Sequence, residues 1–488
     1  MSRKATGIPV SWLSVASLLL ASALCACTQA EPGAASGGDA DRRPNVLLVV
    51  VDTLRADRVA PRPEPGAAAP KPRTPFLDEL ATRGATFDHT YTPTPWTSPS
   101  IATLFTSRYP LQHGVARYDS TLAPGEVTLA EELGASGYAC AGFSANLHIQ
   151  QRLGYAQGFE DWHTYFGDPE GEIKPRAGTL IDRALEWVSE RQSAGDERPG
   201  FLYLQFLEPH SPYEPPEPHR RRAAPDASPQ EIRRANADLT SFHFSAIDDR
   251  KVALLRALYD GEVAFFDAAL KDLFARLEPT GFLDGAIVVV TSDHGEEFRE
   301  HGSLLHGLSL FEPAVRVPLL ILGEGIEGGQ RVAQPTSILD VSATVLDLLG
   351  LEAEPRFEGT SRVPLLKRSH ASARRAVPDA APSDEILLEL AHRGGPREVR
   401  QHAWGLISGR KKLLIDTAGD AWVYDLDADP DEHAPLSAET SEGGRALLST
   451  LARLRGDLET RVNPTAAAPA ELDLETRRRL RALGYAVD

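Results

Sequence analysis

Two neighbouring hydroxyl side chains, Thr97 and Ser98, stand just before Pro99 and an apolar run with helical spacing. Proline is favoured in the first turn of a helix, and serine or threonine ahead of it caps free N–H groups. A helix start also attracts anions, because its unpaired N–H groups and its dipole favour negative charge. The segment therefore has two interpretations. It is an ordinary helix cap, or it directs a nucleophilic oxygen of Thr97 at a bound phosphate or sulfate group.

Three other side chains suit a divalent cation. Asp52 directly follows an apolar, β-branched run at 45–51, and Asp293 and His294 follow a similar run at 286–291. Ligands bind beyond the carboxyl ends of strands in open α/β sheets, so we expect both acidic strand ends to face one crevice. An imidazole beside two carboxylates favours Mn, Zn or Fe over Ca. A lone aspartate after a strand is commonly a turn residue, but the two together favour a metal site.

The elements that would position these residues alternate along the chain. Strands are predicted at 45–51, 201–206, 286–291 and 317–322, and helices at 75–82, 128–136, 179–191, 248–277 and 338–349. Alternation of this kind predicts an α/β fold in which helices cover both faces of the sheet. Proline-rich stretches at 61–75 and 214–235 indicate loops or insertions.

A second, smaller unit is predicted at the end of the chain. Short strand-like segments at 385–390, 403–407, 411–416 and 421–426 predict a small antiparallel sheet, and a charged helical tail follows at 472–485. We therefore expect a catalytic domain at 44–366, a linker at 367–383 and a C-terminal subdomain at 384–488.

The N-terminus has the pattern of an export signal. Basic residues precede an apolar stretch at 8–24, which is too short for a confident membrane span. The L-C-A-C sequence that follows resembles a bacterial lipobox ending at Cys27. We expect a lipoprotein-type signal peptide at 1–27, a flexible tether at 28–43 and membrane anchoring through a lipid on Cys27, in the periplasm or at the cell surface. A plain cleaved signal is the alternative.

Net charge and cysteine content limit the class of binding partner and the possible disulfides. The 488 residues carry a net charge of −18, which argues against nucleic acid because phosphate backbones select basic surfaces. Beyond Cys27 only Cys140 remains, so no intramolecular disulfide is expected in the mature protein.

Motifs in order along the chain resemble the sulfatase family of the alkaline phosphatase superfamily. They are R-P-N-V-L-L-V-V-V-D-T-L-R-A-D at 43–57, T-S-P-S-I-A-T-L-F-T-S-R-Y-P-L-Q-H-G-V at 97–115, E-P-H-S-P-Y at 208–213, T-S-D-H-G-E-E-F-R-E-H-G at 291–302 and V-Y-D-L-D-A-D-P-D-E at 423–432. The resemblance implies an alkaline phosphatase-like fold: a large, mostly parallel sheet flanked by helices, plus a small C-terminal antiparallel sheet. It also implies one divalent cation, Ca, Mg, Mn or Zn.

The resemblance assigns roles to single residues. The metal ligands would be Asp52, Thr97, Asp293 and His294, with Thr97 at the nucleophile position. His210 would contact the oxygens of the ester.

Four further positions complete the predicted site. The resemblance places His306 near the leaving group. For the others two interpretations stay open: proton donation or a structural hydrogen bond for His113, substrate binding or a turn cap for Asn146, and substrate binding or loop shaping for His301.

The chain departs from the family at the nucleophile. Sulfatases have Cys or Ser in a C/S-x-P-x-R pattern and convert it to formylglycine, whereas residues 97–101 read T-S-P-S-I. We therefore expect no formylglycine. Threonine nucleophiles resemble those of phosphodiesterases and phosphoglycerol transferases of the superfamily.

The expected function is metal-dependent hydrolysis of a sulfate or phosphate ester, through attack by Thr97 on a small-molecule, glycan or lipid substrate. One alternative is a transferase that moves a phospho-group to a cell-envelope acceptor. The other is a binding protein that kept the fold without catalysis.

Overall fold

The computed structural model describes residues 43–59, 74–165, 174–367, 384–390, 402–462 and 474–482. The predicted signal peptide, nearly all of the tether and of the linker, and the last six residues lie outside these ranges. Among the described residues, no helix combines the length and the apolar character that crossing a membrane requires.

A nine-stranded sheet forms the centre of the fold, in the order β10-β2-β9-β6-β1-β5-β3-β4, with β11 also paired to β2. At its middle, β1 (Val46–Val51) runs parallel to β5 (Gly200–Phe206) and β6 (Ile287–Ser292). One strand, β9 (Arg316–Leu322), runs antiparallel to β6 and β2. The remaining strands are β2 (Ala85–Tyr91), β3 (Ala139–Ser144), β4 (Asp161–Thr164), β10 (Gln330–Val332) and β11 (Thr336–Ser337).

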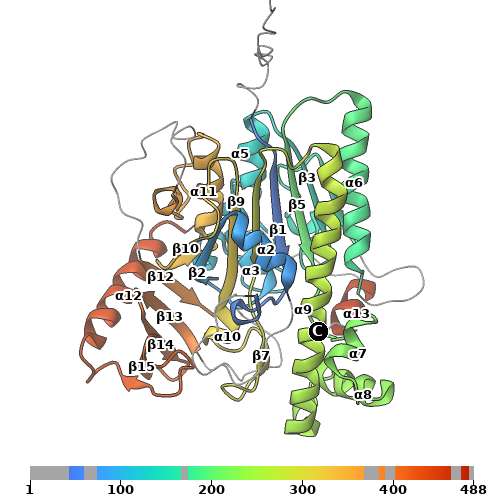
Figure 1. Ribbon diagram of the computed structural model, residues 1–488. Coiled ribbons are helices and arrows are strands. Elements are labelled where there is room, and N and C mark those ends of the chain that lie inside the picture. Colours follow the sequence, from blue (N-terminus) through green and yellow to red (C-terminus); the bar gives the residue numbers. More distant parts are fainter. Residues whose placement is uncertain are drawn as a thin grey trace, which may run out of the picture. The chain divides into compact units, whose positions relative to one another are not determined.

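Helices cover both faces of this sheet because β1 is apolar on both sides (Figure 1). Every side chain of β1 is fully buried, and alternate residues belong to two separate hydrophobic cores. One core includes α2 (Pro75–Arg83), α6 (Ala177–Ala194), α8 (Pro229–Thr240) and α9 (Asp249–Leu277). The other includes α3 (Thr97–Thr106), α5 (Leu129–Ala135) and α11 (Asp340–Leu348). The predicted α/β class is confirmed.

Short elements connect these layers. They are α1 (Ala56–Val59), α4 (Pro110–His113), α7 (His219–Ala223), α10 (Glu312–Val315), β7 (Glu297–Phe298), β8 (Leu304–Leu305) and four 3-10 turns at Gln151–Leu153, Phe244–Ala246, Glu278–Thr280 and Val363–Leu365. β7 and β8 pair as a small hairpin that directly follows the loop after β6.

The prediction of a loop at 214–235 is partly wrong, because α7 and the first half of α8 lie there. The start of α8 is fixed locally. The hydroxyl of Ser228 accepts the N–H of Glu231, the Glu231 carboxylate accepts the N–H of Ser228, and Pro229 occupies the first helical position. A proline-rich composition concealed this capping box.

The predicted antiparallel sheet is confirmed as a five-stranded sheet of β12 (Glu385–Glu389), β13 (His402–Ser408), β14 (Lys411–Asp416), β15 (Ala421–Asp425) and β16 (Leu436–Ser437). An unpredicted helix, α12 (Gly444–Glu459), packs on it through Leu451 and Leu458, and α13 (Leu474–Ala482) lies within the predicted tail.

The two sheets share an interior. Side chains of β12, β13 and β14 form one hydrophobic cluster with Tyr91, Phe311 and Val315. The fully buried ammonium of Lys412 lies 3.1 Å from Glu312 and 2.8 Å from Glu432. A buried charge of this kind is tolerated because it is paired on both sides.

Candidate active site

The register of the central strands brings the two predicted acidic residues together. Val51 of β1 is paired with Ser292 of β6, so Asp52 and Asp293 leave neighbouring strands side by side. The N–H of Thr53 donates to Asp293 Oδ1 at 3.2 Å across this gap. The two acidic strand ends therefore lie next to each other, as expected.

Asp52, Asp293 and His294 form a fully buried group whose ligand atoms all lie within 4.8 Å of one another. The Nε2 atom of His294 is 3.8 Å from Asp52 Oδ1 and 3.5 Å from Asp293 Oδ2. Its Nδ1 lies 3.0 Å from the carbonyl oxygen of Gly295, which can only accept. Nδ1 therefore carries the proton, and Nε2 presents its lone pair to the carboxylates.

This group fits a divalent cation. Asp52 Oδ1 and Asp293 Oδ2 are buried and accept no hydrogen bond from the described residues. Burial raises the pKa of both carboxyl groups, to about 7 for Asp293, and the nearby charge of Asp293 raises the pKa of Asp52 further. A bound cation would supply the positive charge that these two oxygens lack.

Thr97 is the first residue of α3, and its hydroxyl caps nothing. Trp96 occupies the cap position, so the ordinary helix-cap interpretation is wrong. The Oγ1 atom of Thr97 lies 3.3 Å from His294 Nε2 and 3.4 Å from Asn146 Nδ2. The hydroxyl thus lies beside the candidate metal group of Asp52, Asp293 and His294, although its role as nucleophile stays a prediction.

Asn146 follows β3, and its contacts agree with its predicted role in a turn, whereas its role in substrate binding stays a prediction. Its amide oxygen accepts the N–H of His148 at 2.7 Å, which closes the local turn. That contact turns the amide nitrogen toward Asp52 Oδ2, at 2.5 Å, and toward Thr97. His148 itself is buried beside Trp96, with ring centroids 6.0 Å apart, and was not among the predicted site residues.

Two predicted histidines join the metal group. The ring centroid of His306 lies 4.4 Å from that of His294 and 5.2 Å from that of His210. The Nδ1 atom of His210 lies 2.6 Å from the carbonyl oxygen of Ser211, and burial holds the pKa of His210 well below its usual value. His210 is therefore neutral with a lone pair on Nε2, which suits accepting a hydrogen bond rather than donating one to an ester oxygen.

The structure adds a carboxylate that the sequence reasoning missed. Glu296 is fully buried, and its Oε1 atom lies 3.0 Å from Nδ1 of His306. Its other oxygen accepts the hydroxyl of Tyr213 at 2.8 Å. The signal in the sequence was its place two residues after His294, which alone says nothing about its partners.

The structure places His113 and His301 in other contacts. Both ring nitrogens of His113 are engaged, one 3.1 Å from Thr103 Oγ1 and one accepting the N–H of Val115. Burial lowers the pKa of His113 to about 3. His301 stacks on Phe311 and its Nε2 lies 3.0 Å from the carbonyl oxygen of Asp431. These contacts favour the structural interpretation for both, and their roles at the site stay predictions.

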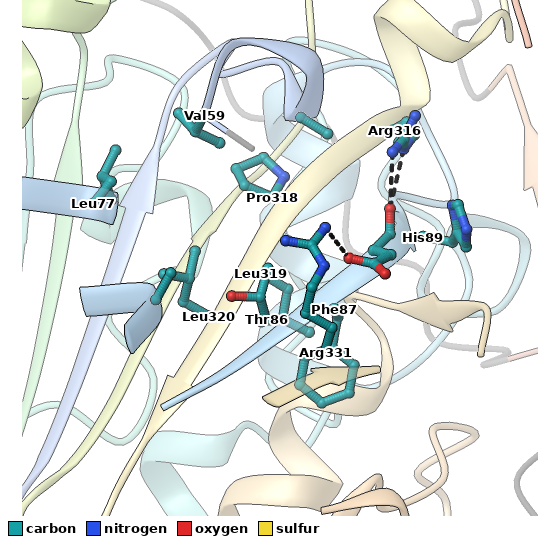
Figure 2. A pocket seen from close by; sticks show the side chains of 13 residues that line it. Val59, Leu77, Thr86, Phe87, His89, Arg316, Pro318, Leu319, Leu320 and Arg331 are labelled. Atoms are coloured by element: carbon teal, nitrogen blue, oxygen red, sulfur yellow. Dashed lines mark hydrogen bonds and ion pairs between the residues drawn. The ribbon is translucent and has the colours of Figure 1, made fainter. Parts of the chain in front are cut away.

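A separate pocket lies between β2, β9 and the helices α1 and α2 (Figure 2). Most of its lining residues are apolar, and its two arginines are engaged with Asp88: Arg331 with the carboxylate, and Arg316 with the carbonyl oxygen at 2.9 Å. None of the predicted site residues lines it.

The sulfatase family model matches residues 44–351, and the chain therefore belongs to the sulfatase family. This confirms the family and, with it, the expectation of a sulfatase-like ester hydrolase. The matched region holds all nine predicted site residues.

Named relatives extend the likeness over most of the chain. A multifunctional alkaline phosphatase superfamily protein of Trinickia caryophylli is 26% identical over 68% of this chain and 78% of its own length. A choline-sulfatase of Rhizobium meliloti is 25% identical over 82% of this chain and 83% of its own. The solved phosphonate monoester hydrolase of Agrobacterium radiobacter shares the fold, with a TM-score of 0.66 at 22% identity, over 89% of this chain and 99% of its own.

Proposed function

We propose that this protein is a metal-dependent hydrolase of sulfate or phosphate esters in which Thr97 is the nucleophile. The observation that carries the proposal is the Thr97 hydroxyl, 3.3 Å from His294 Nε2, together with the buried Oδ1 of Asp52 and Oδ2 of Asp293, which have no hydrogen-bond partner among the described residues. The names of the relatives, a choline-sulfatase and a phosphonate monoester hydrolase, support ester hydrolysis.

The residues Asp52, Thr97, Asp293 and His294 would hold the cation, whose identity among Ca, Mg, Mn and Zn stays open. When bound, it supplies positive charge that lowers the pKa of the Thr97 hydroxyl and balances the anionic ester. Asn146 orients the side chains of Asp52 and Thr97, because its amide nitrogen donates to both of them.

In the first half of the reaction, Thr97 releases its hydroxyl proton to solvent and its Oγ1 attacks the sulfur or phosphorus atom. A bond forms between Oγ1 and that atom, and the bond to the leaving oxygen breaks. The leaving oxygen keeps the electron pair and takes a proton from Nε2 of a protonated His306.

In the second half, water attacks the ester formed on Thr97. The water oxygen bonds to the sulfur or phosphorus atom, and His306, now neutral, accepts a proton from the water. The bond to Oγ1 breaks, and Oγ1 keeps the electron pair and takes back a proton from solvent, which restores the Thr97 hydroxyl. His210, with its lone pair on Nε2, suits accepting a hydrogen bond from that water. The product leaves as sulfate or phosphate, and His306 is protonated again.

The test is an activity screen of the metal-loaded protein on aryl sulfates, phosphate monoesters, phosphodiesters and phosphonate monoesters. We expect turnover of at least one class and a loss of about 10³-fold or more in Thr97→Ala, with cation content largely retained by the three remaining ligands. The matched control is Ser98→Ala, because the neighbouring Ser98 hydroxyl is buried without a hydrogen-bond partner among the described residues and should be dispensable. Full activity of Thr97→Ala would exclude the nucleophile.

We also propose that the chain is exported and anchored in the cell envelope through Cys27. The support is the N-terminal sequence pattern, a basic start, an apolar stretch and L-C-A-C.

A further inference from the structure

The two carboxylate oxygens of Glu296 have different partners, His306 and Tyr213. Oε1 lies 3.0 Å from Nδ1 of His306, and Oε2 accepts the Tyr213 hydroxyl at 2.8 Å. The carboxylate is fully buried, so no bulk water competes for these contacts. Both oxygens therefore have one assigned donor each.

The backbone of Glu296 is fixed independently of its side chain. Its N–H donates to the carbonyl oxygen of Pro313 at 2.9 Å, and its own carbonyl oxygen accepts Nη1 of Arg55 at 3.0 Å. Arg55 is in turn paired with Asp57 at 2.9 Å and with Glu300 at 2.6 Å. The carboxylate thus projects from a rigid base toward His306.

Tyr213 ties this carboxylate to the segment that carries His210. The two residues are three positions apart, and the Tyr213 ring packs against Tyr259 and Phe298 with centroid separations of 5.8 and 5.6 Å. Because the ring is packed on two sides, its hydroxyl is held in place against Glu296. One hydrogen-bonded chain therefore runs from Tyr213 through Glu296 to His306, whose ring stands between His210 and the metal ligand His294.

We propose that Glu296 is a positioning residue for His306, an inference that rests on the proposed function of the site. In its ionised form Glu296 can only accept, so it keeps the proton of His306 on Nδ1 and leaves Nε2 as the atom that faces the ester. Glu296 takes no proton from the substrate and forms no bond to it. The alternative role is purely structural, in which the carboxylate contributes only to folding.

The first experiment measures kcat, KM and cation content for Glu296→Ala, Glu296→Gln and His306→Ala. We expect Glu296→Ala to lower kcat about 10- to 100-fold with KM and cation content little changed. Glu296→Gln should restore much of that loss, because the amide oxygen can still accept the Nδ1 proton. Should Glu296→Ala fail to fold, Tyr213→Phe replaces it, with a smaller loss in the same direction.

The second experiment separates positioning from a structural role by combining the variants. In the His306→Ala background, Glu296→Ala should change kcat by less than about 3-fold, because the residue it positions is gone. Losses that multiply instead would overturn the proposal. Glu297→Gln is the matched control: this neighbouring buried glutamate accepts the Ser309 hydroxyl at 2.6 Å, and its effect should be the same with and without His306.

A readout without turnover keeps this proposal distinct from the proposed function. In histidine-labelled protein, NMR should show a proton on Nδ1 of His306, assigned by its loss in His306→Ala, that shifts or disappears in Glu296→Ala. An unchanged signal would refute the positioning role even in an active enzyme. If no ester is hydrolysed by the wild type, the proposed function fails while this contact is still tested.

Discussion

Replacing Asp293 by asparagine should have opposite effects on stability with and without the cation. Asp293 is fully buried beside Asp52, and its Oδ2 atom has no hydrogen-bond partner among the described residues. Without a bound cation, the negative charge of Asp293 lowers the stability of the folded protein. With a bound cation, the same carboxylate acts as a ligand.

The magnitude follows from the pKa of Asp293, which burial raises from 3.8 to about 7. A carboxyl group with a raised pKa holds its proton more tightly in the folded state, so stability falls as the pH rises from about 4 to 7. At pH 8 the cost is about 4 kcal/mol of unfolding free energy, which asparagine avoids. A cation at 1,000 times its dissociation constant returns about 4 kcal/mol to the wild type, and less to a variant lacking one ligand.

The assay is a melting temperature at pH 8, in chelator and in each of Mn, Zn, Mg and Ca. We expect Asp293→Asn to melt above the wild type in chelator and below it with the binding cation, and the advantage in chelator should shrink toward pH 4. Asp340→Asn is the control, because that buried carboxylate is already paired with Arg362 at 2.7 Å and should lose stability equally in both conditions. An equal drop for Asp293→Asn in both conditions would refute the metal group.

Two further predictions concern other parts of the chain. Burial raises the pKa of Glu208 from 4.5 to about 7, so its contribution to stability should fall by about 3 kcal/mol as the pH rises through that interval. The difference in melting temperature between Glu208→Gln and the wild type should therefore grow from pH 5 to pH 7.5. A difference that stays constant over this range would contradict the burial argument. Cys27→Ser should move the exported protein from the membrane to the soluble fraction and remove the mass of the lipid, whereas an unchanged distribution would exclude the anchor.

The central strands could be predicted because β1, β5 and β6 are continuous apolar runs, which is the pattern of strands buried on both faces. β2 could not, since its sequence A-T-F-D-H-T-Y mixes polar and apolar side chains. The antiparallel direction of β9 likewise cannot be predicted from its local sequence, because the apolar pattern of a strand is the same in either direction.

The metal group could be predicted for a similar reason: parallel neighbours end at the same edge, so residues following them must meet. The remaining site residues depend on contacts far along the chain. Glu296 gains its position from Tyr213, 83 residues earlier. The ring nitrogens of His113 and His301 are taken by partners that no motif reveals.

The paired lysine between the two sheets bears on how this chain can be divided. Lys412 comes from the second sheet, yet one of its two carboxylates, Glu312, begins α10 at the end of the loop that carries His306. A fragment ending before residue 384 would lose the ammonium and leave Glu312 and the apolar side chains around Phe311 facing water. Expression of the first 366 residues alone is therefore a poor route to a minimal enzyme, and a shortened chain should extend at least through Glu432, the second carboxylate partner of Lys412.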